Sequence, residues 1–261
     1  MTQPDSNGTA NRFQRRTAHG VVMTAVVSST AAVLPGVSIV LPCHDEEANV
    51  AAAVRMACRA GVMNAQAYEV IVVDDGSRDA TNAVATRLAA GDPHVRVVAH
   101  PRNRGYGAAL RTGIAAAGQP WVLLTDADLQ FDLVDLAGFV PLAADHDLIA
   151  GYRHKRNDPR RRRWAAAAWN RLVDRVLALH IRDVDCSFKL IRRDLLSELE
   201  LTSNGAVISA ELLARSRAHG ARICERGVRH LPRNAGRQSG LRPRVVVRAS
   251  AELLRLRRTL A

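Results

Sequence analysis

The N-terminal half of the chain alternates short apolar runs with longer helical patterns, and this alternation is the feature that most constrains the fold. The apolar runs lie at residues 37–41, 70–73, 95–99 and 121–125, with helical patterns between them at 46–60, 79–90 and 107–117. Strands that are apolar at successive positions are typical of a parallel sheet covered by helices on both faces. We therefore expect an α/β fold with a mostly parallel central sheet.

Beyond Gly151 the alternation is looser. Residues 153–163 hold seven cations together with Asn157 and Pro159, which favours a loop. After this loop we expect a helix at 164–179, a strand at 185–191, a helix at 209–217, a strand at 222–225 and a helix at 245–260. The expected division is a mobile N-terminal tail at 1–36, one α/β domain at 37–240 and a C-terminal helix at 241–261.

Charge is unevenly distributed along the sequence. Residues 1–150 carry 11 basic and 15 acidic side chains, whereas residues 151–261 carry 26 and 10. This asymmetry suggests an acidic site that takes a cation, beside a basic surface that meets phosphates or an anionic membrane.

Composition also argues against several classes of protein. Aromatic residues make up only 4% of the 261 residues, which is few for a protein that stacks nucleic-acid bases. The four cysteines are scattered, so neither a zinc knuckle nor a disulfide framework is indicated. No run of apolar residues is long enough for a transmembrane helix, and the hydroxyl-rich stretch near residues 21–34 argues against a cleaved signal peptide.

The most specific feature is Asp126-Ala127-Asp128 at the end of the fourth apolar run. Two carboxylates one residue apart at a strand end can share Mg²⁺ or Mn²⁺, which prefer oxygen ligands and complete their shell with substrate phosphate. Gln130 can add an amide oxygen. A solvated acidic turn is the alternative interpretation of this motif.

Two more acidic segments follow earlier strands, at residues 74–77 and 42–47. Ligands of open α/β sheets bind at the carboxyl ends of the strands, so all these side chains converge if the strands are neighbours. Asp45 could instead cap a helix, and Asp75-Gly76 could form a plain turn.

A dinucleotide-binding fold is the obvious competitor. It requires G-x-G-x-x-G after the first strand, but Pro42 stands where the first glycine is needed. Gly105-Tyr106-Gly107 comes too late for that role. We expect it to allow a tight turn into a helix, with Asn103 and Arg104 facing the site.

Taken together, the motifs at 37–47, 72–81, 103–109 and 125–130 resemble family 2 glycosyltransferases of the GT-A fold. Residues 183–190 and 233–239 are similar to the branch of dolichyl-phosphate or polyprenyl-phosphate mannose and glucose synthases. This resemblance implies a nucleotide-sugar donor of the GDP-mannose or UDP-glucose type. The first motif has His44-Asp45-Glu46 where the family usually has Tyr-Asn-Glu, so the base of the donor stays open.

The resemblance also implies roles for individual residues. Asp128, Gln130 and Asp126 are the expected metal site, and Asp126, Asp128 and Lys189 the expected catalytic residues. The expected nucleotide-sugar contacts are Pro42, His44, Glu46, Asp74, Asp75, Arg104 and Asp126.

The expected reaction is an inverting, metal-dependent transfer of a hexose to a polyprenyl phosphate. Such a phosphate is largely ionised at neutral pH, so it needs charge neutralisation rather than a general base. Arginine binds phosphate oxygens bidentately, and two or three of the cations are expected to touch the ligand. The candidates for the acceptor phosphate are Arg153, Arg156, Arg160–Arg163, Lys189, Arg233 and Arg237.

Two other functions stay open. A glycosyltransferase of the same fold could act on a hydroxyl of a glycan or small molecule, and would need a base at Asp183, Asp185 or Glu211. A nucleic-acid-binding protein could use the basic half, but it would leave the acidic strand ends without a purpose. We expect no nucleic-acid partner.

The C-terminal helix has two opposed faces. Val246, Leu253, Leu256 and Leu260 share one face, and Arg244, Arg248, Arg255 and Arg258 the other. This pattern is typical of a helix in the interface of an anionic membrane. The expected location is therefore cytoplasmic, peripheral on the inner face of the membrane. Packing of the leucine face on the domain or on a second subunit is the alternative.

Overall fold

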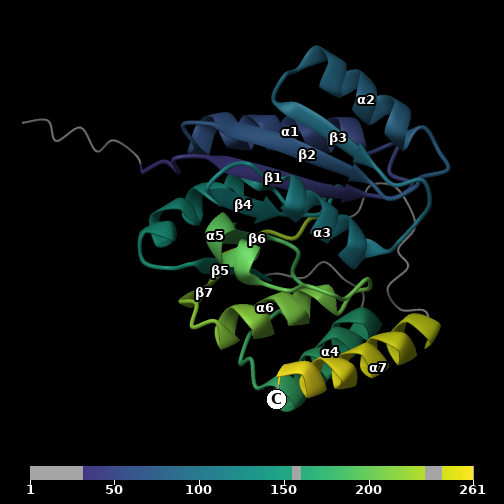
Figure 1. Ribbon diagram of the computed structural model, residues 1–261, viewed down its shortest axis with the longest axis vertical. Helices are drawn as coiled ribbons and strands as arrows, with labels where there is room; N and C mark the ends of the chain where they lie inside the picture. Colours follow the sequence, from purple (N-terminus) through teal and green to yellow (C-terminus); the bar gives the residue numbers. More distant parts are fainter. Residues whose placement is uncertain (1–31, 155–159, 233–242, 261) are drawn as a thin grey trace, which may run out of the picture. The chain divides into compact units, whose positions relative to one another are not determined.

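The computed structural model describes residues 32–154, 160–232 and 243–260. In this part of the chain seven strands form one sheet, in the order β3-β2-β1-β4-β6-β5-β7 (Figure 1). The strands are β1 (Val37–Cys43), β2 (Tyr68–Asp74), β3 (Val95–Ala99), β4 (Trp121–Leu124), β5 (Leu148–Arg153), β6 (Lys189–Arg192) and β7 (Ile223–Val228). All neighbouring strands are parallel except the two pairs that involve β6. The expected mostly parallel α/β sheet is confirmed.

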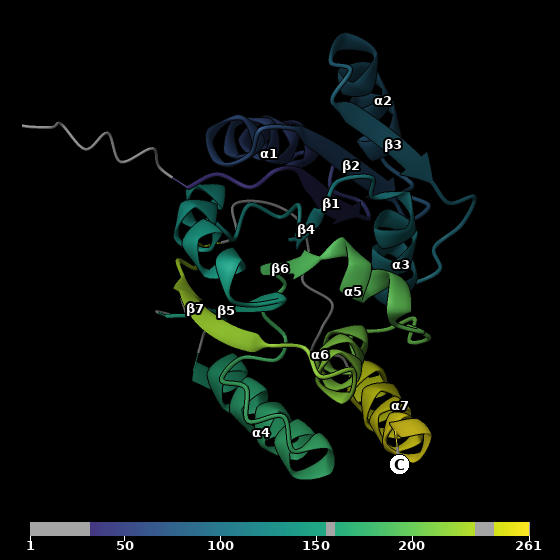
Figure 2. The ribbon, with the colours of Figure 1, turned by 60° about the vertical axis from the view of Figure 1, so that its left-hand side comes forward.

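Helices cover both faces of the sheet (Figure 2). They are α1 (Val50–Asn64), α2 (Thr81–Gly91), α3 (Tyr106–Ala116), α4 (Arg160–Leu177), α5 (Arg193–Glu198), α6 (Ile208–Ala218) and α7 (Pro243–Leu260), with 3₁₀ helices η1 (Leu133–Gly138) and η2 (Val140–Ala144).

Successive residues of β1 enter two different cores. Ile39 and Leu41 belong to the core that contains Val54 of α1, whereas Val40 belongs to the core that contains Leu110 of α3. Side chains alternate between the faces of a strand. A strand buried on both faces therefore has to be apolar throughout, which explains the unbroken apolar runs.

Several boundaries differ from the expected ones. Helix α1 begins at Val50 rather than at 46: residues 47–49 form a turn before it, and the N–H groups of Glu46 and Glu47 donate to the side chains of Thr81 and Asp79. Strand β6 begins at Lys189 rather than at 185. The expected loop at 153–163 is wrong for residues 160–163, which form the first turn of α4; arginine is a good helix former. Strand β5 and both 3₁₀ helices were not anticipated.

Ordered contacts begin before residue 37. Leu34 is buried, its N–H donates to the carbonyl of Asn64 at 2.8 Å, and its carbonyl accepts from the N–H of Gln66 at 2.9 Å. The rest of the expected tail, residues 1–31, lies outside the described residues.

The leucine face of α7 packs on the domain. Leu253 and Leu256 are 1% and 5% exposed and belong to the core that contains Val173 of α4 and Leu212 of α6. The side chains of Val246 and Leu260 lie outside the described residues. Insertion of this face into a membrane is therefore the wrong interpretation of the pattern, and the packing alternative holds for its described part.

Within the part of the chain that the structure describes, no helix combines the length and the apolar character needed to cross a bilayer.

The packing of α7 on the domain can be tested by the stability of two leucine variants. Leu253→Ala should lower the free energy of unfolding by about 2–4 kcal/mol, because it leaves a cavity between α7 and the domain. The neighbouring Leu254 is 56% exposed, so Leu254→Ala should change the free energy by no more than about 0.5 kcal/mol. Urea unfolding of the two variants and the wild type measures the difference. Equal effects would contradict the packing.

Candidate active site

The carboxyl ends of β2, β1 and β4 lie side by side, because these three strands are neighbours in the sheet. Their acidic loops meet around Cys43 at the end of β1. Burial raises the pKa of the Cys43 thiol, and the negative charges of Glu46, Asp74 and Asp126 raise it further. Cys43 is thus close enough to a carboxylate from each of the three loops for its pKa to be affected. The expected convergence of the acidic loops is confirmed by the strand order.

The loops after β1 and β2 are fastened together by hydrogen bonds. The N–H of Asp45 donates to Ser77 Oγ at 3.0 Å, and Asp45 Oδ1 accepts from the N–H of Arg78 at 2.8 Å. The N–H of Glu46 donates to Thr81 Oγ1 at 2.8 Å. Asp45 has a φ of 54° and is not the cap of α1, which is Asn49. It connects the two loops instead.

His44 and Glu46 occupy different environments in this connected pair of loops. His44 is exposed, with Nδ1 3.7 Å from an oxygen of Asp45. Glu46 is half-buried and accepts from Asn49 Nδ2 at 2.6 Å. Pro42 is half-buried near the end of strand β1, paired in register with Val73 of β2. All three stay predicted nucleotide contacts.

Asp75 is buried and organises the loop that leads into α3. Its carboxylate accepts from the N–H of Arg104 at 2.9 Å and of Gly105 at 2.8 Å, and lies 2.7 Å from His100 Nδ1. Gly76 has a φ of 67°, and a Cβ there would lie 2.4 Å from the backbone of Arg102. Asp75-Gly76 therefore forms a turn, as the alternative interpretation had it, and this turn also holds residues 102–105 in place. A direct nucleotide contact by Asp75 stays a prediction.

Asp74 and Arg104 also lie at this edge. Asp74 is buried, and its Oδ1 accepts from the N–H of Ser77 at 3.2 Å. Arg104 lines a pocket beside the first turn of α3. Both residues were expected to contact the nucleotide, and both lie at the edge where the three loops meet.

Asp126 and Asp128 follow β4, on either side of the buried Ala127. Asp126 Oδ1 accepts from the hydroxyl of Tyr106 at 2.9 Å, and Asp128 Oδ1 accepts from the N–H of Gln130 at 3.1 Å. Burial and then the charge of Asp126 raise the pKa of Tyr106 well above its usual value, so the phenol keeps the proton it donates.

These side chains fit a hard divalent cation in chemistry but do not enclose one. Two carboxylates and an amide within five residues supply oxygen donors, as Mg²⁺ and Mn²⁺ prefer. Among the described residues, no group of three or more His, Cys, Asp and Glu side chains could hold a metal ion. A cation bound here would therefore need further ligands from water or from substrate phosphate.

Gln130 also ties the later part of the chain to this loop. Its carbonyl accepts from the N–H of Leu231 at 2.8 Å, and its side-chain amide donates to the carbonyl of Leu231 at 3.4 Å. Arg233 and Arg237 follow shortly after in the sequence, but they lie outside the described residues.

The loop before β6 forms the other side of the edge. Arg153, at the end of β5, makes a bidentate ion pair with Asp183, with N–O distances of 2.6 and 2.7 Å. Lys189 is 1% exposed and donates to the carbonyls of Val184 and Cys186; its burial lowers its pKa. In this structure Lys189 therefore positions the loop, and its phosphate contact and catalytic role stay predictions.

The remaining expected cations are placed only in part. Arg163 is an exposed residue of the first turn of α4. The side chains of Arg160–Arg162 and the whole of Arg156 lie outside the described residues.

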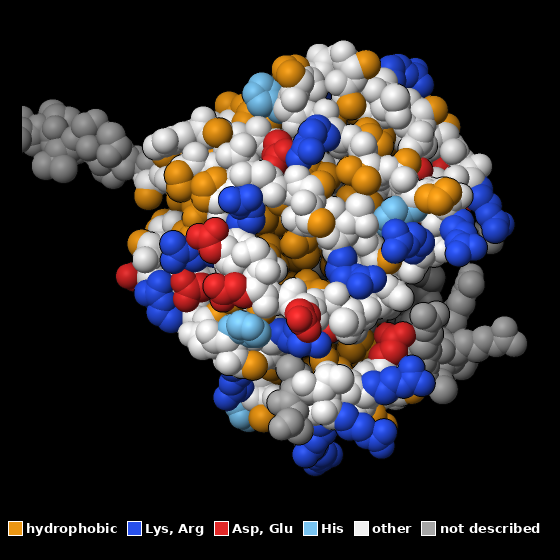
Figure 3. Space-filling model, in the orientation of Figure 1, with side chains coloured by type: hydrophobic (Ala, Val, Ile, Leu, Met, Phe, Trp, Pro, Cys, Tyr) orange, Lys and Arg blue, Asp and Glu red, His pale blue; other side chains and the backbone are white. Residues whose placement is uncertain are grey.

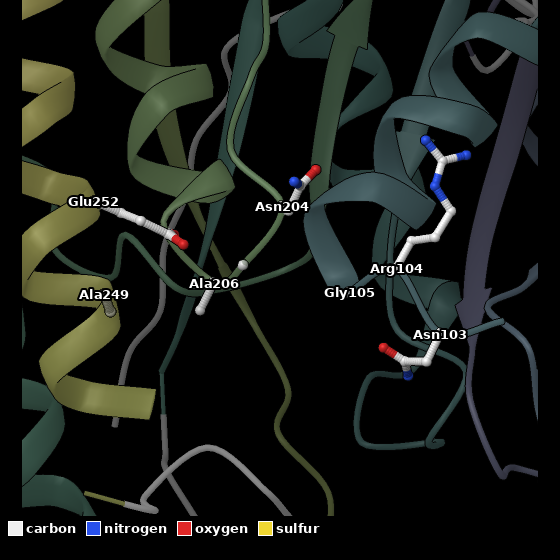
Figure 4. Close-up of a pocket in the computed structure, with 8 residues that line it drawn as sticks. Asn103, Arg104, Gly105, Asn204, Ala206, Ala249 and Glu252 are labelled. Atoms are coloured by element: carbon white, nitrogen blue, oxygen red, sulfur yellow. The ribbon is translucent and has the colours of Figure 1, made fainter. Parts of the chain in front are cut away.

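A pocket of about 280 Å³ lies beside this edge, between the start of α3, the 203–206 loop and α7 (Figure 4). Gly105, with a φ of 99°, makes the expected tight turn into α3. A Cβ on Gly107 would lie 2.3 Å from the carbonyl oxygen of Ser203, so glycine allows the helix to approach the loop. The lining residues are Asn103, Arg104, Gly105, Asn204, Gly205, Ala206, Ala249 and Glu252.

Glu211 does not line this pocket but binds the chain that leads into the 203–206 loop. It is 0% exposed and accepts from the N–H groups of Thr202 and Ser203 at 2.8–3.1 Å. Burial raises its pKa, but these hydrogen bonds outweigh burial and the net pKa is lowered. Glu211 is thus a buried ionised side chain that holds the 202–203 loop, and it does not face an acceptor.

Sequence reasoning missed Tyr106 and Trp169. Tyr106 donates to Asp126, and Trp169 of α4 donates from Nε1 to Asp185 at 3.1 Å. The position of Tyr106 between two glycines at a helix start was the available signal for the first. Nothing in the sequence paired Trp169 with Asp185, because the contact depends on how α4 packs.

The anchoring role of Asp75 can be tested. Asp75→Asn replaces one acceptor oxygen with an NH₂ group that faces a backbone N–H donor, so it should lower the free energy of unfolding by about 1–3 kcal/mol. Asp145 is exposed, so Asp145→Asn is the matched control and should have almost no effect. Thermal and urea unfolding measure both variants; unchanged stability of Asp75→Asn would refute the anchor.

Comparisons with known proteins relate the chain to a family of glycosyltransferases. The model of glycosyl transferase family 2 matches residues 38–200. Glycosyltransferase AglD of Haloferax volcanii is 31% identical over 72% of this chain and 32% of its own length. An undecaprenyl-phosphate 4-deoxy-4-formamido-L-arabinose transferase of Pseudomonas fluorescens is 34% identical over 62% of this chain and 48% of its own. The chain thus spans about a third to a half of these curated relatives.

Solved structures agree on the fold. Glucosyl-3-phosphoglycerate synthase from Mycobacterium tuberculosis, in complex with phosphoglyceric acid, superposes with a TM-score of 0.67 at 20% identity, covering 87% of this chain and 80% of that one. The same enzyme in complex with Mn²⁺ and UDP-glucose superposes with a TM-score of 0.65. The family match, the relatives and the GT-A fold lead to one conclusion: this chain belongs to the family 2 glycosyltransferases.

Proposed function

We propose that this chain catalyses inverting, metal-dependent transfer of a hexose from a nucleoside-diphosphate sugar to a polyprenyl phosphate, at the cytoplasmic surface of a membrane. The observation that carries the choice of acceptor is the state of two of the three carboxylates considered as a general base. Asp183 is held in an ion pair with Arg153, and Glu211 is buried under the 202–203 loop. Neither is presented as a general base, and an ionised phosphate acceptor needs none.

The donor side supports a nucleotide-sugar substrate. The loops after β1, β2 and β4 bring carboxylates and backbone groups together at one edge, where α/β sheets bind nucleotides. The synthase from Mycobacterium tuberculosis has been crystallised with UDP-glucose and Mn²⁺ and has the same fold. A donor of the UDP-glucose or GDP-mannose type is consistent with this edge.

A divalent cation is proposed at Asp126, Asp128 and Gln130. When bound, Mg²⁺ or Mn²⁺ would neutralise negative charge on the leaving nucleoside diphosphate. The hydrogen bond from Tyr106 holds the Asp126 carboxylate in place, and the N–H of Gln130 holds that of Asp128. The two side chains are thereby oriented before substrate arrives.

The acceptor side would orient and neutralise the incoming phosphate. In the transfer, a phosphate oxygen forms the new bond to the anomeric carbon as the bond from that carbon to the diphosphate oxygen breaks. The candidate cations there are Arg153, Arg160, Arg163, Lys189, Arg233 and Arg237. Relatives of this chain include transferases named for undecaprenyl phosphate, which supports a lipid phosphate as acceptor.

A second candidate function is transfer to a hydroxyl, and one observation favours it. Asp185 is an exposed residue, yet the carboxyl group lies against α4 and accepts from Trp169. Desolvation there raises its pKa, partly opposed by this hydrogen bond and by the charge of Lys189. A carboxylate with a raised pKa at the acceptor edge has the properties of a general base.

Asp128→Ala should abolish transfer while leaving the fold intact, because it removes a metal ligand at a strand end and relieves repulsion from Asp126. A thermal shift with Mn²⁺ and each nucleotide sugar tests binding, and radiolabelled sugar transfer to a polyprenyl phosphate tests turnover. Asp145→Ala is the exposed-carboxylate control. Undiminished turnover in Asp128→Ala, or in wild-type protein stripped of metal by EDTA, would rule out the metal site.

Asp185→Asn separates the two candidate acceptors. If a phosphate is the nucleophile, the variant should keep turnover within about threefold of the wild type, since no base is removed from the reaction. If a hydroxyl is the nucleophile, turnover should fall by about 10²–10⁴-fold. Turnover is measured with a polyprenyl phosphate and with free-hydroxyl glycans. A loss of about 10²-fold or more with the phosphate acceptor would overturn the proposal.

A further inference from the structure

The outward face of α4 has an unusual composition for a solvent-exposed helix. Trp164, Ala168, Arg171, Leu172 and Arg175 are all exposed and fall within an arc of about 100° on the helix surface. Trp164 is 73% exposed and Leu172 is 39% exposed. Val173, on the opposite side of the helix, is fully buried in the core. The helix is therefore already anchored, and its outward apolar side chains are not needed for packing within the described residues.

Helix α7 lies beside α4 and has a similar outward composition (Figure 1). Arg257 Nη1 donates to the carbonyl of Val176 at 3.2 Å and joins the two helices. Leu254, Arg255 and Arg258 are exposed, on the side opposite the buried Leu253. Two helices that pack side by side thus both present leucine or tryptophan among arginines.

The charge of this region is strongly positive. The two helices contain eleven arginines against two carboxylates, Asp174 and Glu252. Asp174 accepts from the N–H of His180 at 2.7 Å, and Glu252 lines the pocket of Figure 4. Basic side chains are visible at the end of the molecule where α4 and α7 lie, as they are elsewhere on this face (Figure 3). A partner for this face has to be anionic and able to take up apolar side chains.

We propose that the outward faces of α4 and α7, centred on Trp164 and Leu172, form a surface that docks on an anionic lipid bilayer. Tryptophan and leucine enter the boundary between head groups and acyl chains, while arginines meet anionic head groups. This inference rests on the proposed function for its purpose, but not for its evidence.

The inner face of α4 connects the docking surface to the acceptor edge. Trp169 donates to Asp185, and Asn170 Nδ2 donates to the carbonyl of Arg182 at 2.6 Å. The helix that would lie on the bilayer is therefore hydrogen-bonded to the loop that precedes β6. Docking would bring this loop next to the head groups, where the phosphate of a lipid acceptor lies.

The test is sedimentation of the full chain with vesicles of phosphatidylcholine, with and without phosphatidylglycerol. Trp164→Ser/Leu172→Ser should reduce binding to anionic vesicles about tenfold, by removing the apolar contribution. Arg171→Glu/Arg175→Glu should reduce it at least about tenfold and leave no preference for anionic lipid.

Matched controls lie on α1, at the other end of the molecule (Figure 1). Val62 and Met63 are 66% and 55% exposed, and Arg55 and Arg59 are exposed. Val62→Ser/Met63→Ser and Arg55→Glu/Arg59→Glu should bind vesicles like the wild type. Equal losses in the α1 and α4 variants, or undiminished binding by both α4 variants, would overturn the docking surface.

Trp164→Phe keeps the apolar character of the side chain. It therefore tests the proposal even if Trp164→Ser/Leu172→Ser fails to fold. It should still bind vesicles but lose most of the tryptophan quenching by brominated lipid that we expect for the wild type. Undiminished quenching would place Trp164 outside the bilayer and overturn the proposal. A concentration-dependent dimer that Trp164→Ser/Leu172→Ser dissociates would assign the face to a second copy of this chain, and would also overturn it.

Activity separates this inference from the proposed function. With a short, water-soluble prenyl phosphate the α4 variants should turn over like the wild type, whereas with long-chain acceptor in vesicles they should be at least about tenfold slower. Vesicle binding without transfer to either acceptor would refute the proposed function and leave the docking surface standing. Transfer to both acceptors without vesicle binding that depends on α4 would refute the docking surface and leave the proposed function standing.

Discussion

Four carboxylates are held at one edge of the sheet, and each accepts a hydrogen bond from the structure around it. Asp74 accepts from the N–H of Ser77, Asp75 from the N–H groups of the 104–105 loop, Asp126 from Tyr106 and Asp128 from the N–H of Gln130. Like charges brought this close repel one another. These donors stabilise the cluster in the absence of a cation and hold the loops that carry it, so the rest of the site depends on them.

The two sides of the edge are organised by different interactions. On the proposed donor side, backbone N–H groups and short side chains join the loops after β1 and β2. On the proposed acceptor side, charged side chains organise the loop: Arg153 pairs with Asp183, and the buried ammonium of Lys189 donates to the loop carbonyls. The arginine of an Arg–carboxylate pair can exchange its carboxylate for another anion, whereas the hydrogen bonds between the two loops offer no such exchange. This difference is consistent with the proposed nucleotide site beside a proposed site for an incoming phosphate.

The helices α4 and α7 show that an amphipathic pattern can lead to the wrong prediction of what its apolar face contacts. Both helices bury one face in the domain, and the buried face of α7 holds the leucines that suggested a membrane anchor. What distinguishes the region is the composition of the outward faces, where Trp164 and Leu254 are more than half exposed among arginines. The hydrophobic period of a helix reports that it has a buried face but not what covers it.

The sequence by itself determined the α/β class, the strands β1 to β4 and the convergence of three acidic loops, because local periodicity and the position of polar residues after each strand carry that information. Tertiary structure decided what the individual side chains do. Asp75 became a loop anchor because Arg104 and Gly105 lie against it, Glu211 a buried support because α6 passes under the 202–203 loop, and the leucine face of α7 a packing surface because α4 and α6 lie beside it. Such roles depend on contacts between residues far apart in the sequence, and no local pattern encodes which distant group a side chain will meet.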